Sequence, residues 1–109
     1  GAANLGDIGQ FFPSDNNKWK GMDSTYFLSI TLEKVLSAGY KLEHVDTVVI
    51  LRKPKFGQFI PGMQLKLAKA LQTDKGNISI KATTTDHLGF IGESKGWGAL
   101  AIASLSKLE

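Results

Sequence analysis

A short run of β-branched and apolar residues in the middle of the chain places the strongest limit on its fold. Residues 45–51 read VDTVVIL, a composition typical of a strand that is buried in a sheet. The basic turn that follows contains Pro54, which lacks the backbone N–H that a strand ladder needs. We therefore expect the strand to end at this turn.

Two amphipathic helices are predicted, one before and one after this strand. Residues 23–38 carry an apolar stripe at helical spacing, with Asp23 or Ser24 available to cap the start and Gly39 to end the helix. Residues 60–71 repeat the pattern and have a proline near the first turn, where helices tolerate it. Helix and strand therefore alternate along the chain.

Two further strands are predicted towards the C-terminus. Residues 77–83 alternate apolar and polar side chains, which is typical of a half-buried strand. In residues 97–105, Leu100 and Ile102 are expected to face one side of the strand, and the alanines at positions 99, 101 and 103 the other. Such small side chains would let a helix or another strand approach closely.

These elements predict an α+β fold in which helices pack on one face of a small mixed β-sheet. A chain of 109 residues is expected to form a single domain, residues 1–109. Three strands leave the sheet with two edges and one poorly covered face. We therefore expect further elements, a partner subunit, or both.

The composition excludes several classes of function. The chain has no cysteine, which excludes disulfides, thiol catalysis and cysteine–zinc sites. Its net charge of +3 combines 13 basic with 10 acidic residues, a balance that gives no argument for nucleic acid. No apolar stretch approaches the roughly 20 residues of a membrane helix, and no signal peptide is apparent. We expect neither a nucleic acid nor a membrane as partner.

Hydroxyl groups and one carboxylate follow directly on the strand at residues 77–83. Thr83, Thr84 and Thr85 could cradle a phosphate with their hydroxyls and backbone amides. Asp86 could hold Mg²⁺ against a diphosphate. The alternative is structural, since threonine is a good strand residue and either Thr85 or Asp86 is a good helix cap.

Two other segments have a possible binding role and an equally simple structural one. Arg52, Lys53 and Lys55 place three cations at a strand end, where they could meet a nucleotide or merely protect a sheet edge. Asp7 could bind a sugar while Gly9 allows close backbone approach, or the two could form an ordinary turn.

The loop at residues 7–21 is rich in turn formers but also carries Phe11, Phe12 and Trp19. These aromatic side chains either pack on the core or line a site, and the sequence does not decide between the two. The two histidines, His44 and His87, are expected on the surface, because two ligands do not make a metal site.

Several motifs, in order and without an obvious gap from residue 1 to about residue 107, resemble a single family. They read LGDIG at 5–9, FP at 12–13, KGMDS at 20–24, GY at 39–40, VD at 45–46, RKPK at 52–55, IP-x-M at 60–63 and IKATTTDHLGFIG at 80–92. Together they resemble the central signature of the 2-C-methyl-D-erythritol 2,4-cyclodiphosphate synthases, and the last motif is the strongest match.

The resemblance implies a phosphorus–oxygen lyase of the non-mevalonate isoprenoid pathway. The implied substrate is 4-diphosphocytidyl-2-C-methyl-D-erythritol 2-phosphate, whose 2-phosphate attacks the β-phosphorus of the diphosphate and releases CMP. The family also implies Zn²⁺, a second divalent ion (Mg²⁺ or Mn²⁺), and a homotrimer with active sites between subunits. Its implied location is the cytoplasm or a plastid-like organelle.

The same resemblance implies roles for individual residues. Thr84 takes the position that stabilises the transition state, and Asp86 the position that holds the second metal ion. Substrate contacts are implied for four segments. They are the sugar segment Asp7, Ile8 and Gly9; the methylerythritol phosphate segment Phe12, Pro13, Ser14, Asp15 and Asn16; the cytidine segment Leu51, Arg52, Lys53, Pro54, Lys55, Phe56 and Gly57; and a last segment of Thr83, Thr84, Thr85, Asp86, Phe90 and Glu93, in which Thr83 and Thr84 bind the phosphates.

Three departures from the family pattern fall on these segments. Ser14, Asp15 and Asn16 stand where the family usually has two carboxylates, so only one is left. Asp86 replaces a glutamate and is one methylene shorter. Glu93 and Lys95 reverse the usual order of a basic and an acidic residue.

The family's Asp-x-His motif and its later histidines, which supply the zinc ligands, have no counterpart in this sequence. We therefore expect the chain to be the C-terminal two-thirds of such a domain and to contain no zinc ligands. The alternative function is an inactive fragment or homologue that binds cytidine nucleotides or only assembles as a trimer.

Overall fold

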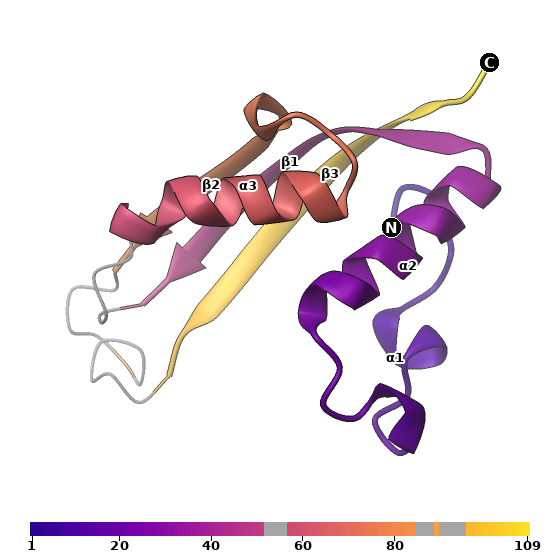
Figure 1. Ribbon diagram of the computed structural model, residues 1–109, viewed down its shortest axis with the longest axis horizontal. Helices are drawn as coiled ribbons and strands as arrows, with labels where there is room; N and C mark the ends of the chain where they lie inside the picture. The colour runs from indigo at the N-terminus through magenta and orange to yellow at the C-terminus, as the bar shows by residue number, and fades with distance from the viewer. Residues whose placement is uncertain (52–56, 85–88, 90–95) are drawn as a thin grey trace.

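A computed structural model describes residues 1–51, 57–84, 89 and 96–109 of the chain (Figure 1). Its longer elements follow in the order helix, strand, helix, strand, strand, as the sequence predicts. In chain order the elements are α1 (Ile8–Phe11), η1 (Asn17–Trp19), α2 (Ser24–Ser37), β1 (Tyr40–Ile50), η2 (Gly57–Phe59), α3 (Ile60–Ala70), η3 (Lys75–Asn77), β2 (Ile78–Thr83) and β3 (Gly98–Lys107).

The three strands form one mixed sheet in the order β2-β1-β3. β1 and β2 run parallel, with Val45 opposite Ile78, and are joined by the crossover helix α3. β1 and β3 run antiparallel, with Val48 opposite Leu100. The predicted small mixed sheet is therefore confirmed.

β1 begins at Tyr40, five residues before the predicted start, and is the longest strand. Its first residues alternate between half-buried and exposed positions and pair with the end of β3, where Tyr40 lies opposite Lys107. A β-bulge between Leu42 and His44 interrupts this pairing. The prediction was too short because the pairing partner lies almost at the other end of the chain.

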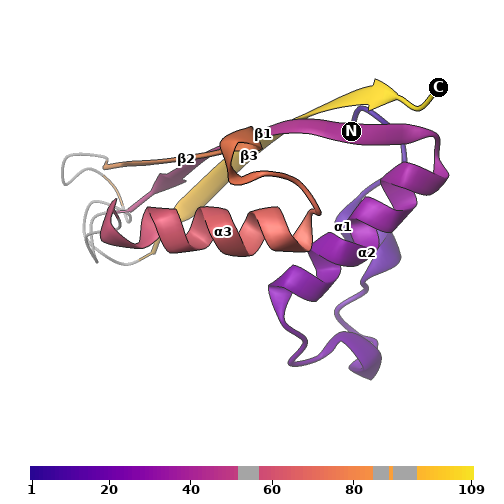
Figure 2. The same ribbon diagram turned by 45° about the horizontal axis from the view of Figure 1, so that its top comes forward.

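The core lies between α3 and the sheet. It consists of Val49, Leu51, Ile78 and Ile80 from the sheet side and Ala68 from α3, all less than 9% exposed. Figure 2 shows α3 running along one side of the sheet. The side-chain amide of Gln64 also donates to the carbonyl of Ile78 at 2.8 Å, which ties the helix to β2.

α2 lies on the same side of the sheet as α3 (Figure 2). The carboxylate of Asp23 caps it by accepting from the backbone N–H of Thr25 at 2.9 Å. Gly39 has φ +91°, a left-handed conformation that ends the helix and that glycine adopts without strain. Both predicted end signals are confirmed.

The opposite face of the sheet has no helix over it among the described residues (Figure 2). The register places Leu100 and Ile102 on this open face, with exposed fractions of 67% and 74%. Asp46 and Lys81 form an ion pair on it, with 3.1 Å between their nearest charged atoms. The predicted poorly covered face is therefore present.

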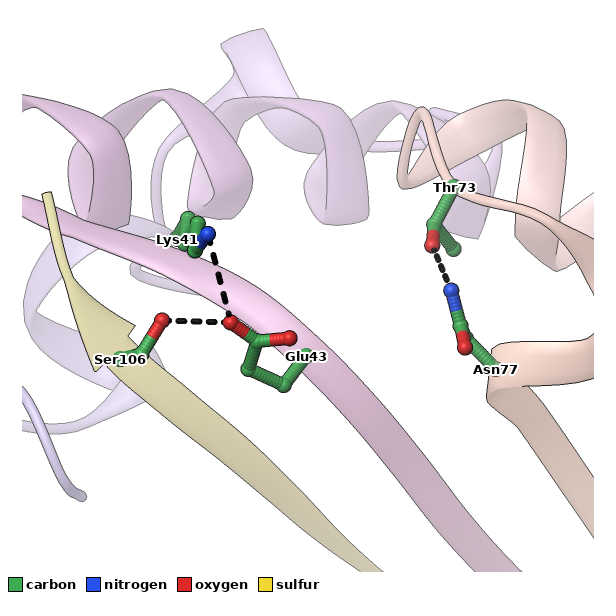
Figure 3. A network of polar contacts seen from close by, with 5 residues as sticks. All are labelled: Lys41, Glu43, Thr73, Asn77 and Ser106. Atoms are coloured by element: carbon green, nitrogen blue, oxygen red, sulfur yellow. Dashed lines mark hydrogen bonds and ion pairs between the residues drawn. The ribbon is translucent and has the colours of Figure 1, made fainter.

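A small polar network joins the start of β1 to the end of β3 (Figure 3). The carboxylate of Glu43 accepts from the Ser106 hydroxyl at 2.6 Å and lies 3.6 Å from the Lys41 ammonium. The hydroxyl hydrogen bond, followed by the lysine charge, lowers the pKa of Glu43.

In the described part of the chain, no helix is both long and apolar enough to cross a membrane.

Replacing Asp23 should make the stability of the protein less dependent on acid pH. The hydrogen bond from the backbone of Thr25, then that from its hydroxyl, then the charge of Lys66, lower the pKa of Asp23. The carboxylate therefore stabilises the fold above its unfolded pKa of about 4, and this contribution is lost as pH falls through the folded pKa.

We expect Asp23→Ala to lower the melting temperature at pH 7 and to lower it less at pH 2 to 3. The matched variant Asp23→Asn keeps a cap acceptor without a titrating group, so it should lower the melting temperature less than Asp23→Ala does at pH 7, and its difference from the wild type should also shrink at pH 2 to 3, as Asp23 becomes protonated. Thermal melts followed by circular dichroism would measure both. An equal effect of Asp23→Ala at both pH values would contradict the assignment.

Candidate functional site

The carboxyl ends of β1 and β2 meet at one edge of the sheet. The parallel register places Ile50 opposite Thr83. The backbone N–H of Leu51 donates to the carbonyl of Thr83 at 3.1 Å. Two of the predicted substrate segments, those that begin at Leu51 and Thr83, therefore start side by side.

Leu51 and the two threonines present different groups at this edge. Leu51 is only 8% exposed as a residue and its side chain belongs to the core, so that side chain is not accessible to a ligand. Thr83 and Thr84 are exposed. Backbone groups from one strand end and hydroxyl groups from the other can thus contact the same ligand.

α3 begins at this edge as well (Figures 1 and 2). Gly57 opens the short turn η2 that leads into the helix. Phe59, the residue before the helix, makes no side-chain hydrogen bond to the first turn. The positive end of the helix dipole therefore faces the region where the two strands end, which favours an anion there.

The other predicted residues of these two segments lie outside the described part of the chain. They are Arg52, Lys53, Pro54, Lys55, Phe56, Thr85, Asp86, Phe90 and Glu93. The roles implied for them remain predictions.

The predicted sugar segment forms the start of α1. Asp7 caps this short helix, and its Oδ1 accepts from the backbone N–H of Gln10 at 3.0 Å. Ile8 is 71% exposed. A Cβ added at Gly9 would lie 3.3 Å from Asp7 Oδ1, a tight contact that favours glycine beside this carboxylate. Asp7 thus has one oxygen engaged in shaping the local backbone.

The aromatic residues of the following loop pack on one another and on α2. The ring centroids of Phe12 and Phe27 are 4.8 Å apart, and Trp19 lies against both rings. Phe11 is covered by the Lys34 ammonium at 4.3 Å from its ring centre. The rings of Phe12 and Trp19 therefore pack against α2, while Phe11 and Phe12 also line a cavity.

The predicted site residues fall into two groups at opposite ends of the structure. α1 and the loop after it lie at one end, and the carboxyl ends of β1 and β2 lie at the other (Figures 1 and 2). Within a single chain, the residues predicted to bind the sugar therefore lie far from those predicted to bind the phosphates.

An open cavity of about 650 Å³ lies between the N-terminal segment, α2 and the sheet. Its lining is largely apolar and includes Leu5, Phe11, Leu32, Val35, Leu42 and Ala101. The sequence gives no direct signal for this cavity. The alanines of β3 were expected to allow close packing, but Ala101 and Ala103 line the cavity instead.

No group of three or more histidine, cysteine, aspartate or glutamate side chains gathers within residues 1–51, 57–84, 89 and 96–109. The Zn²⁺ ion that the resemblance implies therefore does not fit the described residues. Asp86 and His87 lie outside them, so the structure gives no test of the second metal ion.

The sequence pattern of the YgbB family matches residues 1–106. The 2-C-methyl-D-erythritol 2,4-cyclodiphosphate synthase of Desulforamulus reducens is 43% identical over 107 residues, which cover 98% of this chain and 68% of that protein. The synthase of Azobacteroides pseudotrichonymphae is also 43% identical, over 99% of this chain and 65% of that protein.

Solved structures agree with the sequence comparison. The bifunctional IspDF of Campylobacter jejuni superposes with a TM-score of 0.95 at 38% identity, covering 100% of this chain and 30% of that chain. The CDP complex of IspF from Plasmodium falciparum superposes with a TM-score of 0.81 at 28% identity, covering 94% of this chain and 61% of that chain. The fold is thus that of the cyclodiphosphate synthases.

The chain belongs to the YgbB family. It spans about two-thirds of the length of the curated relatives that it matches.

Shortening Leu51 should destabilise the protein, because its side chain belongs to the core at the candidate site. We expect Leu51→Ala to lower the free energy of unfolding by about 2–5 kcal/mol through the cavity it leaves. Leu65 is 58% exposed on α3, and Leu65→Ala should change the value by only about 0.5 kcal/mol. Urea unfolding would measure both variants, and equal effects would contradict the placement of Leu51.

Proposed function

We propose that this chain carries part of a 2-C-methyl-D-erythritol 2,4-cyclodiphosphate synthase, which converts 4-diphosphocytidyl-2-C-methyl-D-erythritol 2-phosphate to the cyclic diphosphate and CMP. The observation that carries the proposal is the hydrogen bond between Leu51 and Thr83, which joins the starts of two of the implied substrate segments at one edge. Its cellular setting would be the cytoplasm or a plastid-like organelle, as the pathway implies.

The reaction needs charge stabilisation more than proton transfer. An oxygen of the 2-phosphate forms a bond to the β-phosphorus, and the bond from that phosphorus to the bridging oxygen of CMP breaks. The four negative charges of the substrate are divided equally between the two products, so no proton has to move. The task of the protein is to bring one anion in line with another and to stabilise the charge of the transition state.

The edge formed by β1 and β2 suits the cytidine and phosphate part of the substrate. Exposed Thr83 and Thr84 can donate to phosphate oxygens, and the positive end of the α3 dipole favours negative charge. The backbone from Leu51 to Gly57 would read the base, because the side chain of Leu51 is buried. The CDP found in the related Plasmodium falciparum complex supports this choice of ligand.

The remaining implied residues complete this half of the proposed site. Arg52, Lys53, Pro54, Lys55 and Phe56 would border the cytidine, Thr85 the phosphates, and Phe90 and Glu93 would be further substrate contacts. Asp86 would hold Mg²⁺ or Mn²⁺, which when bound would neutralise diphosphate charge. No step is assigned to zinc, since the described residues do not fit it.

The methylerythritol phosphate would be bound by the other group of residues, from Asp7 to Asn16. Because this group lies at the far end of the same chain, a complete site needs the matching edge of a second copy (Figure 1). A ring of three copies satisfies this requirement for every site at once. We therefore propose a homotrimer with its active sites between subunits.

The open face of the sheet is the proposed contact between the three copies. Leu100 and Ile102 lie on it with most of their surface exposed. Val48 and Ile50 share this face by strand alternation and are only half-buried. Burying these apolar side chains against the same face of a neighbour would stabilise the assembly. The alanine side chains of β3 lie on the other, helix side of the sheet and are not part of this proposed contact.

Thr84→Ala in the full-length protein should lower turnover far more than the affinity for CDP. Its donor serves charge that develops during transfer, so its removal is expected to reduce kcat by about 100-fold or more. CMP release and CDP titration calorimetry would measure the two quantities. Thr73, after the end of α3, provides a matched control, since Thr73→Ala removes the same atoms away from both groups of proposed site residues. Equal losses of turnover in the two variants would contradict the role of Thr84.

Ile102→Asp should convert the full-length protein from trimer to monomer, because it places a charge in the middle of the proposed contact. The control is Leu65→Asp, which adds the same charge to an exposed leucine on the outer side of α3. Sedimentation velocity would give the oligomeric state of both. An Ile102→Asp variant that sediments as the wild type would show that the open face is not the contact.

A further inference from the structure

The loop between α1 and α2 is shaped by hydrogen bonds within itself. The backbone N–H of Asn16 donates to Pro13 at 3.1 Å, and that of Met22 to Trp19 at 3.3 Å. The side chain of Asn16 accepts from the backbone N–H of Lys18 at 3.0 Å. In the described part of the chain these bonds end inside the loop, so they fold it but do not attach it to the body of the protein.

Three aromatic rings attach the loop to α2. We call Phe12, Trp19 and Phe27 the aromatic cluster. The edge of one ring faces the other in the pair Phe12–Trp19, with centroids 5.1 Å apart and planes at 89°. Phe27 belongs to the first turns of α2 and contacts both of the others, with centroids 4.8 Å from Phe12 and 6.0 Å from Trp19. Such arrangements are the preferred geometry of aromatic pairs.

The cluster holds both ends of a short polar segment. Phe12 lies directly before residues 13–16, and Trp19 follows three residues after them. Between the two rings, Ser14 and Asp15 are exposed. The rings therefore fix where the hydroxyl and the carboxylate of this segment stand relative to α2 and α1.

Of the three rings in the cluster, Trp19 is the one whose removal should disturb the rest of the fold least. It is half-buried, belongs to a single turn of 3-10 helix, and also carries the Lys18 ammonium 4.7 Å over its ring. Its removal would free the far end of the polar segment while leaving the contact between Phe12 and Phe27.

We propose that Trp19 is a positioning residue for the substrate, acting by holding Ser14 and Asp15 in the arrangement that receives the methylerythritol phosphate group. This inference rests on the synthase function proposed above. Trp19 itself does not touch the substrate. Without its ring, the polar segment would have to become ordered each time substrate binds, and the cost of that ordering would appear in substrate affinity.

The two ends of the chain allow a sharp test, because the described residues proposed to bind the cytidine lie at the other end of the chain from this loop and share no contact with the aromatic cluster. In the full-length protein, Trp19→Ala should raise the KM for the substrate by about tenfold, the cost of ordering a few side chains. The Kd for CDP should stay within about twofold, which is less than the cost of ordering one side chain. Trp19→Phe keeps an aromatic edge and should restore most of the substrate affinity.

Tyr26→Ala is the matched control. It removes an aromatic side chain from the same turn of α2 as Phe27, but one that is 46% exposed and has no ring contact within the described residues. Its KM should equal that of the wild type. Should Trp19→Ala fail to fold, Phe27→Leu breaks the contact between Trp19 and Phe27 from the helix side, together with that between Phe12 and Phe27, and should also raise the KM.

The possible results separate this inference from the function on which it rests. Wild-type turnover with an unchanged KM in Trp19→Ala overturns the inference and leaves the function standing. A parallel loss of substrate and CDP affinity, or no recovery in Trp19→Phe, also overturns it, because either result indicates general damage to the fold. A wild-type protein without synthase turnover overturns the proposed function and this inference together.

Discussion

The packing of α3 on the parallel pair β1 and β2 is the interaction on which the rest of the structure depends. Ile78 and Ile80 from β2 meet Val49 from β1, and Ala68 is small enough to let the helix lie close above them. A parallel pair has to be joined by a crossover, so both strands end at the same edge and the helix begins there. One buried apolar cluster therefore decides where backbone groups, threonine hydroxyls and a helix dipole come together.

The parts of the fold that the sequence predicts well are those specified locally. The apolar stripes and end signals of α2 and α3 depend on residues within a few turns of each other, and both helices were predicted to within about a residue of their observed ends. The strand at 45–51 was recognised from its composition. Its extension back to Tyr40 was missed because that part is stabilised by pairing with residues near the C-terminus. Non-local pairing leaves only a weak pattern in a single sequence.

For the candidate site, too, some features can be predicted from the sequence and others depend on the fold. The motifs locate the two groups of residues, but only the fold shows that they lie at opposite ends of the chain (Figure 1). The sequence could not decide whether the loop aromatics pack or line a site, since either use needs the same residue types. The packing of Phe12, Trp19 and Phe27 depends on where α2 lies, which is a tertiary fact.

The arrangement of the strands also has a consequence for the order in which the protein folds. β1, α3 and β2 follow one another closely along the chain and can form their core with short loops to close. β3 must return across most of the chain to reach β1, with Tyr40 opposite Lys107, and it adds few buried side chains when it does. Because closing that long loop costs conformational entropy and buries little surface in return, β3 is expected to form last in folding and to be among the first elements to open. Its backbone amides are then the least protected of the sheet against hydrogen exchange in a single chain, and contact with neighbouring subunits would protect them.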